Sequence, residues 1–369
     1  MGPAARQQAW LDGHQVQMLL PLADKGPHTE QWRTTVILPE GRSFELSQQL
    51  LVGAIDIHVH AGPHIFSSPR RVDPVQAAIQ ARDAGMRAIV FMDVFEMSNG
   101  TAWLVNRVVP DFKTYGGLIL NTVYGGMNPR AVKTAISYGD GAKYISFGAH
   151  STYFQAAREG RKVDGRFVPL SELYPKFKTE ELDRCIRIPV EGPPTPELDE
   201  ILQLIAANPH VYLNTGHVSV EEALRLVDLA GEYGIKKLLV PSAVTKIATL
   251  EQLRHMAARG AFIEYTLAAY THTTPIPKTH YYVEREYASI DEGMSEEATG
   301  GVRLAAEQIQ ALGAEHCIIS TDFGVYTLPE PVEGLREFVA CLLDLGIPTD
   351  DIQKLIRDNP ARLLGLDGQ

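Results

Sequence analysis

From Ala54 onward the sequence repeats one unit: a short apolar run, a turn, and a segment with the hydrophobic spacing of an amphipathic helix. Eight of these runs are predicted to be strands, at 54–60, 88–92, 117–120, 142–147, 211–214, 237–240, 261–266 and 317–321. Alternation of strand and helix at this count favours an α/β fold, a (β/α)8 TIM barrel. A doubly wound open sheet is the alternative, but no Gly-x-Gly-x-x-Gly follows the first strand.

The barrel domain is expected to span 51–369, after an N-terminal extension of residues 1–50. Two short strands at 31–38 and 43–46, around the turn signal at 39–42, would make this extension a small β element. Its first 25 residues could equally form a disordered tail. Long loops follow the fourth strand (151–194) and the seventh (267–295), and loops of this length are lids, interface elements or plain surface elaborations.

The composition narrows the classes of partner. The 369 residues are 45% hydrophobic and carry a formal net charge of −11, which argues against nucleic acid or an anionic membrane as a partner. The three cysteines show no paired spacing, and no apolar run approaches the roughly 20 residues of a membrane span. We therefore expect a cytoplasmic protein without a signal peptide. A small-molecule substrate and a homo-oligomeric state are also expected.

The most informative motif is Ile-Asp-Ile-His-Val-His in the first predicted strand. Side chains alternate along a strand, so His58 and His60 point to the same side, roughly 7 Å apart. Neutral imidazole is a good ligand for zinc and related metals. Two such residues before the Gly62-Pro63 turn indicate half of a metal site. The alternative is that both histidines lie on a solvated edge strand and bind nothing.

Other polar residues stand where further predicted strands end. In a barrel the carboxyl ends of the strands form the active site, so these residues would meet His58 and His60 there. They are Asp93, His150, His217 and Asp322. Asp322 ends the run Ile-Ile-Ser-Thr-Asp and could bind metal and accept a proton from water, although an aspartate there could also cap a helix. Glu264, on the seventh predicted strand, is a further candidate for an acid–base or supporting role.

These motifs resemble the amidohydrolase superfamily of metal-dependent hydrolases over 54–366. The superfamily pattern implies His58, His60, His217 and Asp322 as metal ligands, and the run Asp-Asn-Pro-Ala-Arg-Leu-Leu-Gly-Leu resembles its C-terminal helix. A poorly characterised bacterial branch is more similar still. Its motifs correspond to 58–63, 215–219, 320–322 and 331–335.

One position departs from the superfamily pattern. Ser242 stands at the end of the sixth predicted strand, where the resemblance implies a histidine that binds a second metal or acts as an acid. The replacements considered for it are His150 and the loop histidines His64, His272 and His280. Lys143 resembles the carbamylated lysine of binuclear relatives in being on the fourth strand, but it lies near the start of that strand.

The resemblance implies a metal-dependent hydrolase in which a metal-activated water cleaves an amide, cyclic amide, ester or lactone bond. The expected cofactor is a divalent ion, Zn2+ in the simplest case and otherwise Mn2+ or another transition metal. Asp322 would be the catalytic base. The alternative is a metal-dependent decarboxylase or hydratase of a small aromatic or unsaturated acid, anchored by a basic residue among Arg70, Arg71, Lys246 and Lys278. A non-catalytic binding protein is the third interpretation.

Overall fold

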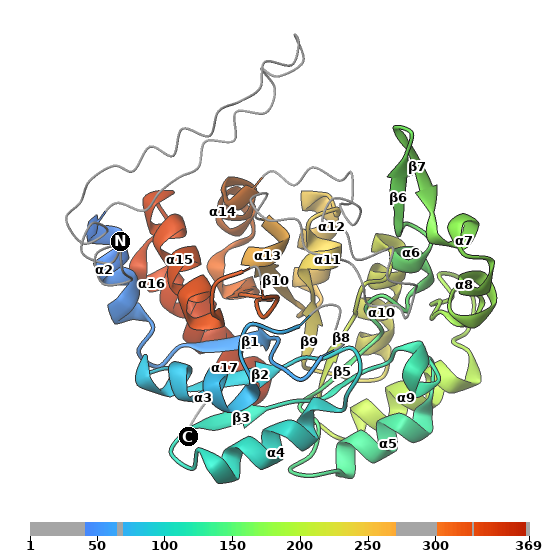
Figure 1. Ribbon diagram of the computed structural model, residues 1–369, viewed down its shortest axis with the longest axis horizontal. Coiled ribbons are helices and arrows are strands. Elements are labelled where there is room, and N and C mark those ends of the chain that lie inside the picture. The colour runs from blue at the N-terminus through green and yellow to red at the C-terminus, as the bar shows by residue number, and fades with distance from the viewer. Residues whose placement is uncertain (1–40, 65–68, 271–300, 327, 367–369) are drawn as a thin grey trace.

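The computed structural model describes residues 41–64, 69–270, 301–326 and 328–366. In these parts of the chain, short parallel strands alternate with helices, and the helices surround the strands (Figure 1). None of the helices described there is long and apolar enough to cross a membrane. The predicted α/β class is confirmed.

The parallel strands form two sheets, with the orders β1-β2-β3 and β11-β10-β9-β8-β5-β4. In chain order they are β1 (Ile55–Val59), β2 (Ala88–Phe91), β3 (Lys113–Tyr115), β4 (Leu118–Ile119), β5 (Tyr144–Ser146), β8 (Tyr212–Asn214), β9 (Leu238–Val240), β10 (Phe262–Thr266) and β11 (Cys317–Ser320). Each of the eight predicted ranges contains one of these strands. Strand β3 was missed because a Lys-Thr-Tyr segment carries no apolar run.

Two connections relate the sheets to each other. Strands β3 and β4 are consecutive pieces of chain, separated only by Gly116 and Gly117, and each pairs with a different sheet. At the other edge, a parallel bridge joins Val59 to Phe323, and the Asp322 amide donates to the His58 carbonyl at 2.9 Å. The ends of β1 and β11 are therefore held side by side, which is what positions the site described below.

Both faces of the strands are buried. Alternate residues of β2 belong to two separate hydrophobic clusters: Ile89 and Phe91 to a large one that includes the surrounding helices, Ala88 and Val90 to a smaller one. The smaller cluster also takes in Leu363 and Leu364 from the C-terminal helix. Burial on both faces explains why the strands are continuous apolar runs, since parallel sheets are covered on both sides.

Capping residues mark the start of several of the longer helices. Asp73 and Ser219 each form a capping box, with Gln76 and Glu222, and Asn128 caps a helix that has proline in its first turn. The longer helices after residue 50 are α3 (Pro74–Asp83), α4 (Ser98–Val108), α5 (Pro129–Ser137), α9 (Pro196–Ala206), α10 (Val220–Glu232), α12 (Leu250–Ala258), α14 (Gly301–Leu312) and α15 (Pro331–Asp344). Helices α4 and α15 begin without a side-chain cap.

The C-terminal helical region comprises α16 (Thr349–Gln353), a π-helical turn (Lys354–Asp358) and α17 (Asn359–Leu364). Helix α17 lies within the Asp-Asn-Pro-Ala-Arg-Leu-Leu-Gly-Leu run, whose resemblance predicted a C-terminal helix. Pro360 lies in the first turn of α17, where its missing N–H costs no hydrogen bond.

The expected strand at 43–46 is wrong. Residues Gly41–Leu50 form helix α2, which packs against α15. The helical spacing of Leu46 and Leu50 turns both toward the body of the protein, and Arg336 of α15 lies over the Phe44 ring. The other expected strand, 31–38, and the first 25 residues lie outside the described residues.

The first long loop contains its own secondary structure. It holds α6 (Tyr153–Ala156), the antiparallel hairpin β6 (Gly160–Val163) and β7 (Arg166–Pro169), α7 (Leu170–Leu173) and α8 (Pro175–Glu180). A small hydrophobic cluster of its own includes Leu170, Phe177 and Leu182, and the hairpin projects from the body (Figure 1). The second long loop starts as helix α13 (Leu267–Tyr270); its remainder, with His272, Lys278 and His280, lies outside the described residues.

Candidate metal site

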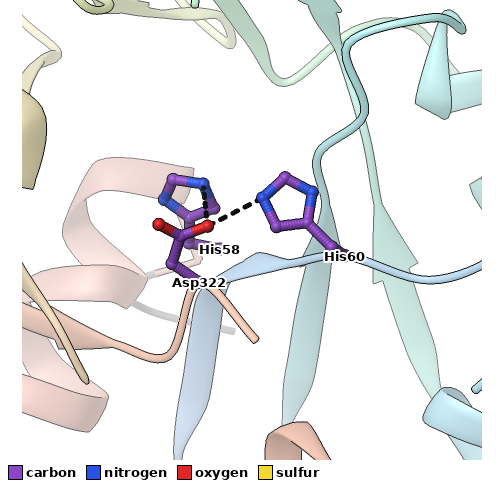
Figure 2. Close-up of side chains that lie close together, drawn as sticks. All are labelled: His58, His60 and Asp322. Carbon is purple, nitrogen blue, oxygen red and sulfur yellow. Dashed lines mark hydrogen bonds and ion pairs between the residues drawn. The ribbon is translucent and has the colours of Figure 1, made fainter. Parts of the chain in front are cut away.

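Three predicted site residues, His58, His60 and Asp322, come together where β1 and β11 end. One potential ligand atom from each lies within 4.8 Å of the other two. The Nε2 atoms of His58 and His60 are 3.4 Å and 2.8 Å from the same oxygen, Oδ1 of Asp322. Figure 2 shows both imidazoles turned toward this carboxylate. We call these residues the His–His–Asp triad.

The backbone around the triad is tightly constrained. Asp322 has a φ of 55°, in the left-handed region that a non-glycine residue seldom adopts. The next turn brings Gly324, with a φ of 152°, so close to β1 that a Cβ there would lie 1.9 Å from the His60 carbonyl oxygen. Unusual backbone conformations of this kind concentrate at functional sites.

Gly324→Ala is expected to lower stability by about 3 kcal/mol or more, because its Cβ would collide with the His60 backbone. Gly346→Ala is the matched control: its φ is also positive, at 86°, but nothing lies within 4 Å of the added Cβ. The control should cost about 1 kcal/mol, from backbone strain alone. Thermal or denaturant unfolding of the two variants measures the difference, and equal losses would refute the close approach.

Glu264 of β10 supports the triad from behind. Its Oε1 is 3.2 Å from Nδ1 of His58 and accepts a hydrogen bond of 2.6 Å from the Ser320 hydroxyl. A carboxylate on one imidazole nitrogen fixes the ring and leaves the other nitrogen to face a metal. Glu264 is fully buried, so the supporting role fits it better than contact with a substrate.

Asp56 was missed as a site residue. Its Oδ1 accepts from the His58 amide at 3.0 Å, and its Oδ2 accepts from the Thr321 hydroxyl at 2.6 Å. It thus ties β1 to the end of β11 directly beneath the triad. Burial, opposed by these hydrogen bonds, raises the pKa of Asp56 to about 6. The sequence did contain a signal for Asp56. Side chains alternate along a strand, so Asp56, His58 and His60 share one face of β1.

The triad residues perturb one another electrostatically. Burial alone would raise the pKa of Asp322, but His58 and His60 hold it well below its usual range. Burial would lower the pKa of His58, but the charges of Asp322 and Glu264 raise it to about 9. A concentration of buried, mutually shifted groups is a mark of functional sites.

His217 and His150 lie beside the triad. Burial and the neighbouring His150 lower the pKa of His217 to about 3, so its imidazole is neutral and able to ligate a metal. Its ligand atoms lie outside the group of mutually close atoms in the triad. The two rings are 5.9 Å apart, and Nδ1 of His150 is 2.6 Å from the buried carboxylate of Glu159, in the first long loop.

Asp93 belongs to a second cluster. Its Oδ2 is 3.3 Å from Nδ1 of His64 and 3.7 Å from Nη2 of Arg70. Burial would raise the pKa of Asp93, but its hydrogen bond to His64 and the Arg70 charge lower it. Arg70 connects this second cluster to the triad. Its charge adds to the effect of burial in lowering the pKa of His60.

Ser242 has a structural role. Its hydroxyl donates to the Glu264 carbonyl at 3.1 Å and accepts from the Thr266 amide at 2.6 Å, which joins the short helix α11 (Ser242–Thr245) to β10. Lys143 donates to the Leu364 carbonyl near the C-terminal helix, 3.2 Å away. Neither side chain replaces a ligand of the triad among the contacts of the described residues.

The triad fits a divalent metal ion by the chemistry of its donors. Two imidazole nitrogens and a carboxylate oxygen, with a second carboxylate that orients one imidazole, are a ligand set that suits zinc and related ions. The three donor atoms lie within 4.8 Å of one another, and His58 is almost fully buried. His217 is the neighbouring neutral imidazole that could add a fourth donor.

Solved structures with a similar fold include a probable dipeptidase and two amidohydrolases. The probable dipeptidase PvdM from Pseudomonas aeruginosa matches with a TM-score of 0.56 and 12% identity, over 88% of this chain and 98% of that one. An amidohydrolase from Mycoplasma synoviae matches with a TM-score of 0.51 and 14% identity, over 85% and 88% of the two chains. An amidohydrolase from Pseudomonas aeruginosa gives 0.50 and 14%, over 86% and 98%. The chain thus has the amidohydrolase fold, as its motifs predicted.

Residues 53–264 match the model of a family of unknown function, DUF6282. Because this match covers more than half of the sequence, the chain belongs to that family. No protein with a curated description matches the sequence significantly.

Proposed function

We propose that this protein is a metal-dependent hydrolase of the amidohydrolase type, which cleaves an amide, cyclic amide, ester or lactone bond in a small molecule. The observation that carries the proposal is the His–His–Asp triad, with Glu264 behind it. The amidohydrolase fold gives this arrangement its context but does not by itself identify a reaction.

His58, His60 and Asp322 would hold the ion, with His217 as a further ligand. A divalent ion there would supply Lewis acidity and an activated water at neutral pH. Asp322, held ionised by its histidine neighbours, can accept a proton and pass it to the leaving group. Glu264 and Asp56 keep His58 and the end of β11 in position.

The metal is proposed to be zinc, because a donor set of imidazoles and one carboxylate matches it; Mn2+ or another transition metal is the alternative. We also propose that the two sheets close into a (β/α)8 barrel. The Gly116-Gly117 connection and the bridge between Val59 and Phe323 support closure. A barrel domain from residue 51, a homo-oligomeric state and a cytoplasmic location complete the proposal.

The test is turnover of a panel of small esters, lactones, amides and cyclic amides by protein whose metal content has been measured. The proposal expects hydrolysis that chelation abolishes and that zinc or manganese restores. Protein that binds metal at the triad but hydrolyses no member of the panel would contradict the hydrolase assignment. Release of carbon dioxide from aryl acids in the same assay would instead support the decarboxylase alternative. The buried Arg70 beside the site is the observation that favours this alternative, because a decarboxylase needs a basic residue to anchor its acid substrate.

The hairpin β6–β7 is expected to act as a lid over the substrate. It follows β5, so the insertion starts at the edge of the sheet that carries the site, and Glu159 at its base contacts His150. Its turn, Asp164-Gly165, has left-handed backbone at both residues, and a Cβ at Gly165 would meet nothing within 4 Å.

Removal of residues 163–166 and rejoining of the strands should therefore raise KM about tenfold with little change in kcat or in melting temperature. Steady-state kinetics on a substrate found in the panel, with circular dichroism as the check on folding, measure this effect. Unchanged kinetics would show that the hairpin is a surface elaboration.

A further inference from the structure

The guanidinium of Arg70 is buried beside the triad without a full set of acceptors. Its side chain is only 2% exposed, and within the described residues Nε and Nη2 have no hydrogen-bond partner. Oδ2 of Asp93 is 3.7 Å from Nη2 of Arg70, a distance too long for a hydrogen bond. A buried arginine with open donors is costly, because an unpaired polar group loses its water and gains nothing in exchange.

The backbone holds Arg70 next to the triad. An antiparallel bridge pairs Arg70 with Val325, and the Arg71 amide donates to the Gly324 carbonyl at 2.6 Å. Both contacts are made to the segment that directly follows Asp322. Burial and, after it, the Arg70 charge lower the pKa of His60, and the Asp322 charge acts in turn on Arg70. The open donors therefore lie at the same end of the strands as the reacting groups.

We propose that Arg70 anchors a carboxylate group of the substrate. This inference rests on the proposed function, in that the group so held would belong to the molecule acted on at the triad. A guanidinium presents parallel N–H donors in the planar geometry that a carboxylate accepts in pairs. Asp93, whose Oδ2 lies 3.7 Å from Nη2 and 3.3 Å from Nδ1 of His64, is close enough to orient the guanidinium before the substrate arrives, while Nε and Nη2 keep N–H donors for the substrate.

The local charges favour a carboxylate over a phosphate. The charges that act on Arg70 are those of the Asp93 and Asp322 carboxylates, and together they exceed the single positive charge of the guanidinium. A dianionic phosphate would add two more negative charges to this site, whereas a carboxylate adds one. Arg71, the next residue, is not a comparable anchor: its side chain is exposed and pairs with Glu330 at 3.2 Å.

The test compares binding of carboxylates and of their uncharged amides to the chelator-treated, metal-free protein. The probes are benzoate with benzamide, butyrate with butyramide, and N-acetylglycine with its amide; inorganic phosphate is the competing anion. Calorimetric titration gives each dissociation constant. Wild-type protein should bind at least one carboxylate about tenfold or more tightly than its amide and than phosphate.

Arg70→Gln should abolish that preference, and Arg70→Lys, which keeps the charge without the planar fork, should weaken it about tenfold. Arg71→Gln is the control and should retain it. Circular dichroism of all variants establishes folding. If Arg70→Gln is unstable, Arg70→Lys still tests the proposal, because it keeps a positive charge beside Asp93. Absence of any carboxylate preference, a preference for phosphate, or a preference that survives both Arg70 variants would overturn the proposal.

Because the metal is absent from this assay, its outcome is separable from that of the proposed reaction. A protein that hydrolyses the panel substrates but shows no carboxylate preference would contradict the role proposed for Arg70 and support the hydrolase assignment. A protein that binds carboxylates through Arg70 but takes up no metal would support the role proposed for Arg70 and contradict the metal-dependent hydrolase assignment.

Discussion

Asp322→Asn is expected to reduce kcat/KM by about a hundredfold or more, the usual scale for the loss of a general base. Asparagine keeps the size of the side chain and one oxygen near His58 and His60, but it cannot accept a proton. It also tolerates the left-handed backbone that residue 322 adopts, so the fold should survive. The measurement is turnover of a panel substrate, with metal content determined on the same sample.

Ser242→Ala is the comparison. It removes the acceptor of the buried Thr266 amide, so stability should fall by about 1–3 kcal/mol, but activity and metal content should change little. An active Asp322→Asn protein beside an inactive Ser242→Ala protein would reverse the roles assigned here. Helix α11 would then have a function beyond holding β10.

The double variant His58→Ala, His60→Ala should lose its bound divalent metal almost completely. It removes two of the three ligands in the triad, so only Asp322 and the further proposed ligand His217 remain, and half of the donor set holds a transition metal far less tightly. Elemental analysis after dialysis against a weak chelator measures the loss.

The matched control is His255→Ala with His316→Ala. These two histidines are also removed as a pair, but their side chains are 44% and 42% exposed and lie beside Asp228 and Glu315 on the outer helices. The control should keep the wild-type metal content. Full metal in the triad variant, or equal loss in both, would show that the ion binds elsewhere.

The strands were predictable because burial on both faces requires continuous apolar runs, and their order along the chain follows from alternation with helices. The convergence of His58, His60 and Asp322 was predictable for the same reason: each stands at the end of such a run. Helix α2 was missed because residues 39–42 were interpreted as a turn and 43–46 as a strand, although the spacing of Leu46 and Leu50 is helical and the segment packs against α15.

The second cluster could not be predicted. Asp93 was expected beside the other strand-end residues, but its partners are His64 and Arg70, in the segment after β1. Nothing in their spacing indicates that this segment folds back along the chain after Asp322; the backbone contacts to Gly324 and Val325 bring it there. Such loop contacts leave no periodic signal in a sequence.

The insertion after β5 packs largely around its own small cluster of Leu170, Phe177 and Leu182. Side chains that stabilise it are therefore distinct from those that stabilise the sheets, and substitutions in one are expected to be additive with substitutions in the other. During divergence of such a family, this segment can change its shape over the substrate while the framework that carries the triad stays constant. Among the described segments, the insertion is thus one that can vary with little risk to the folding of the sheets.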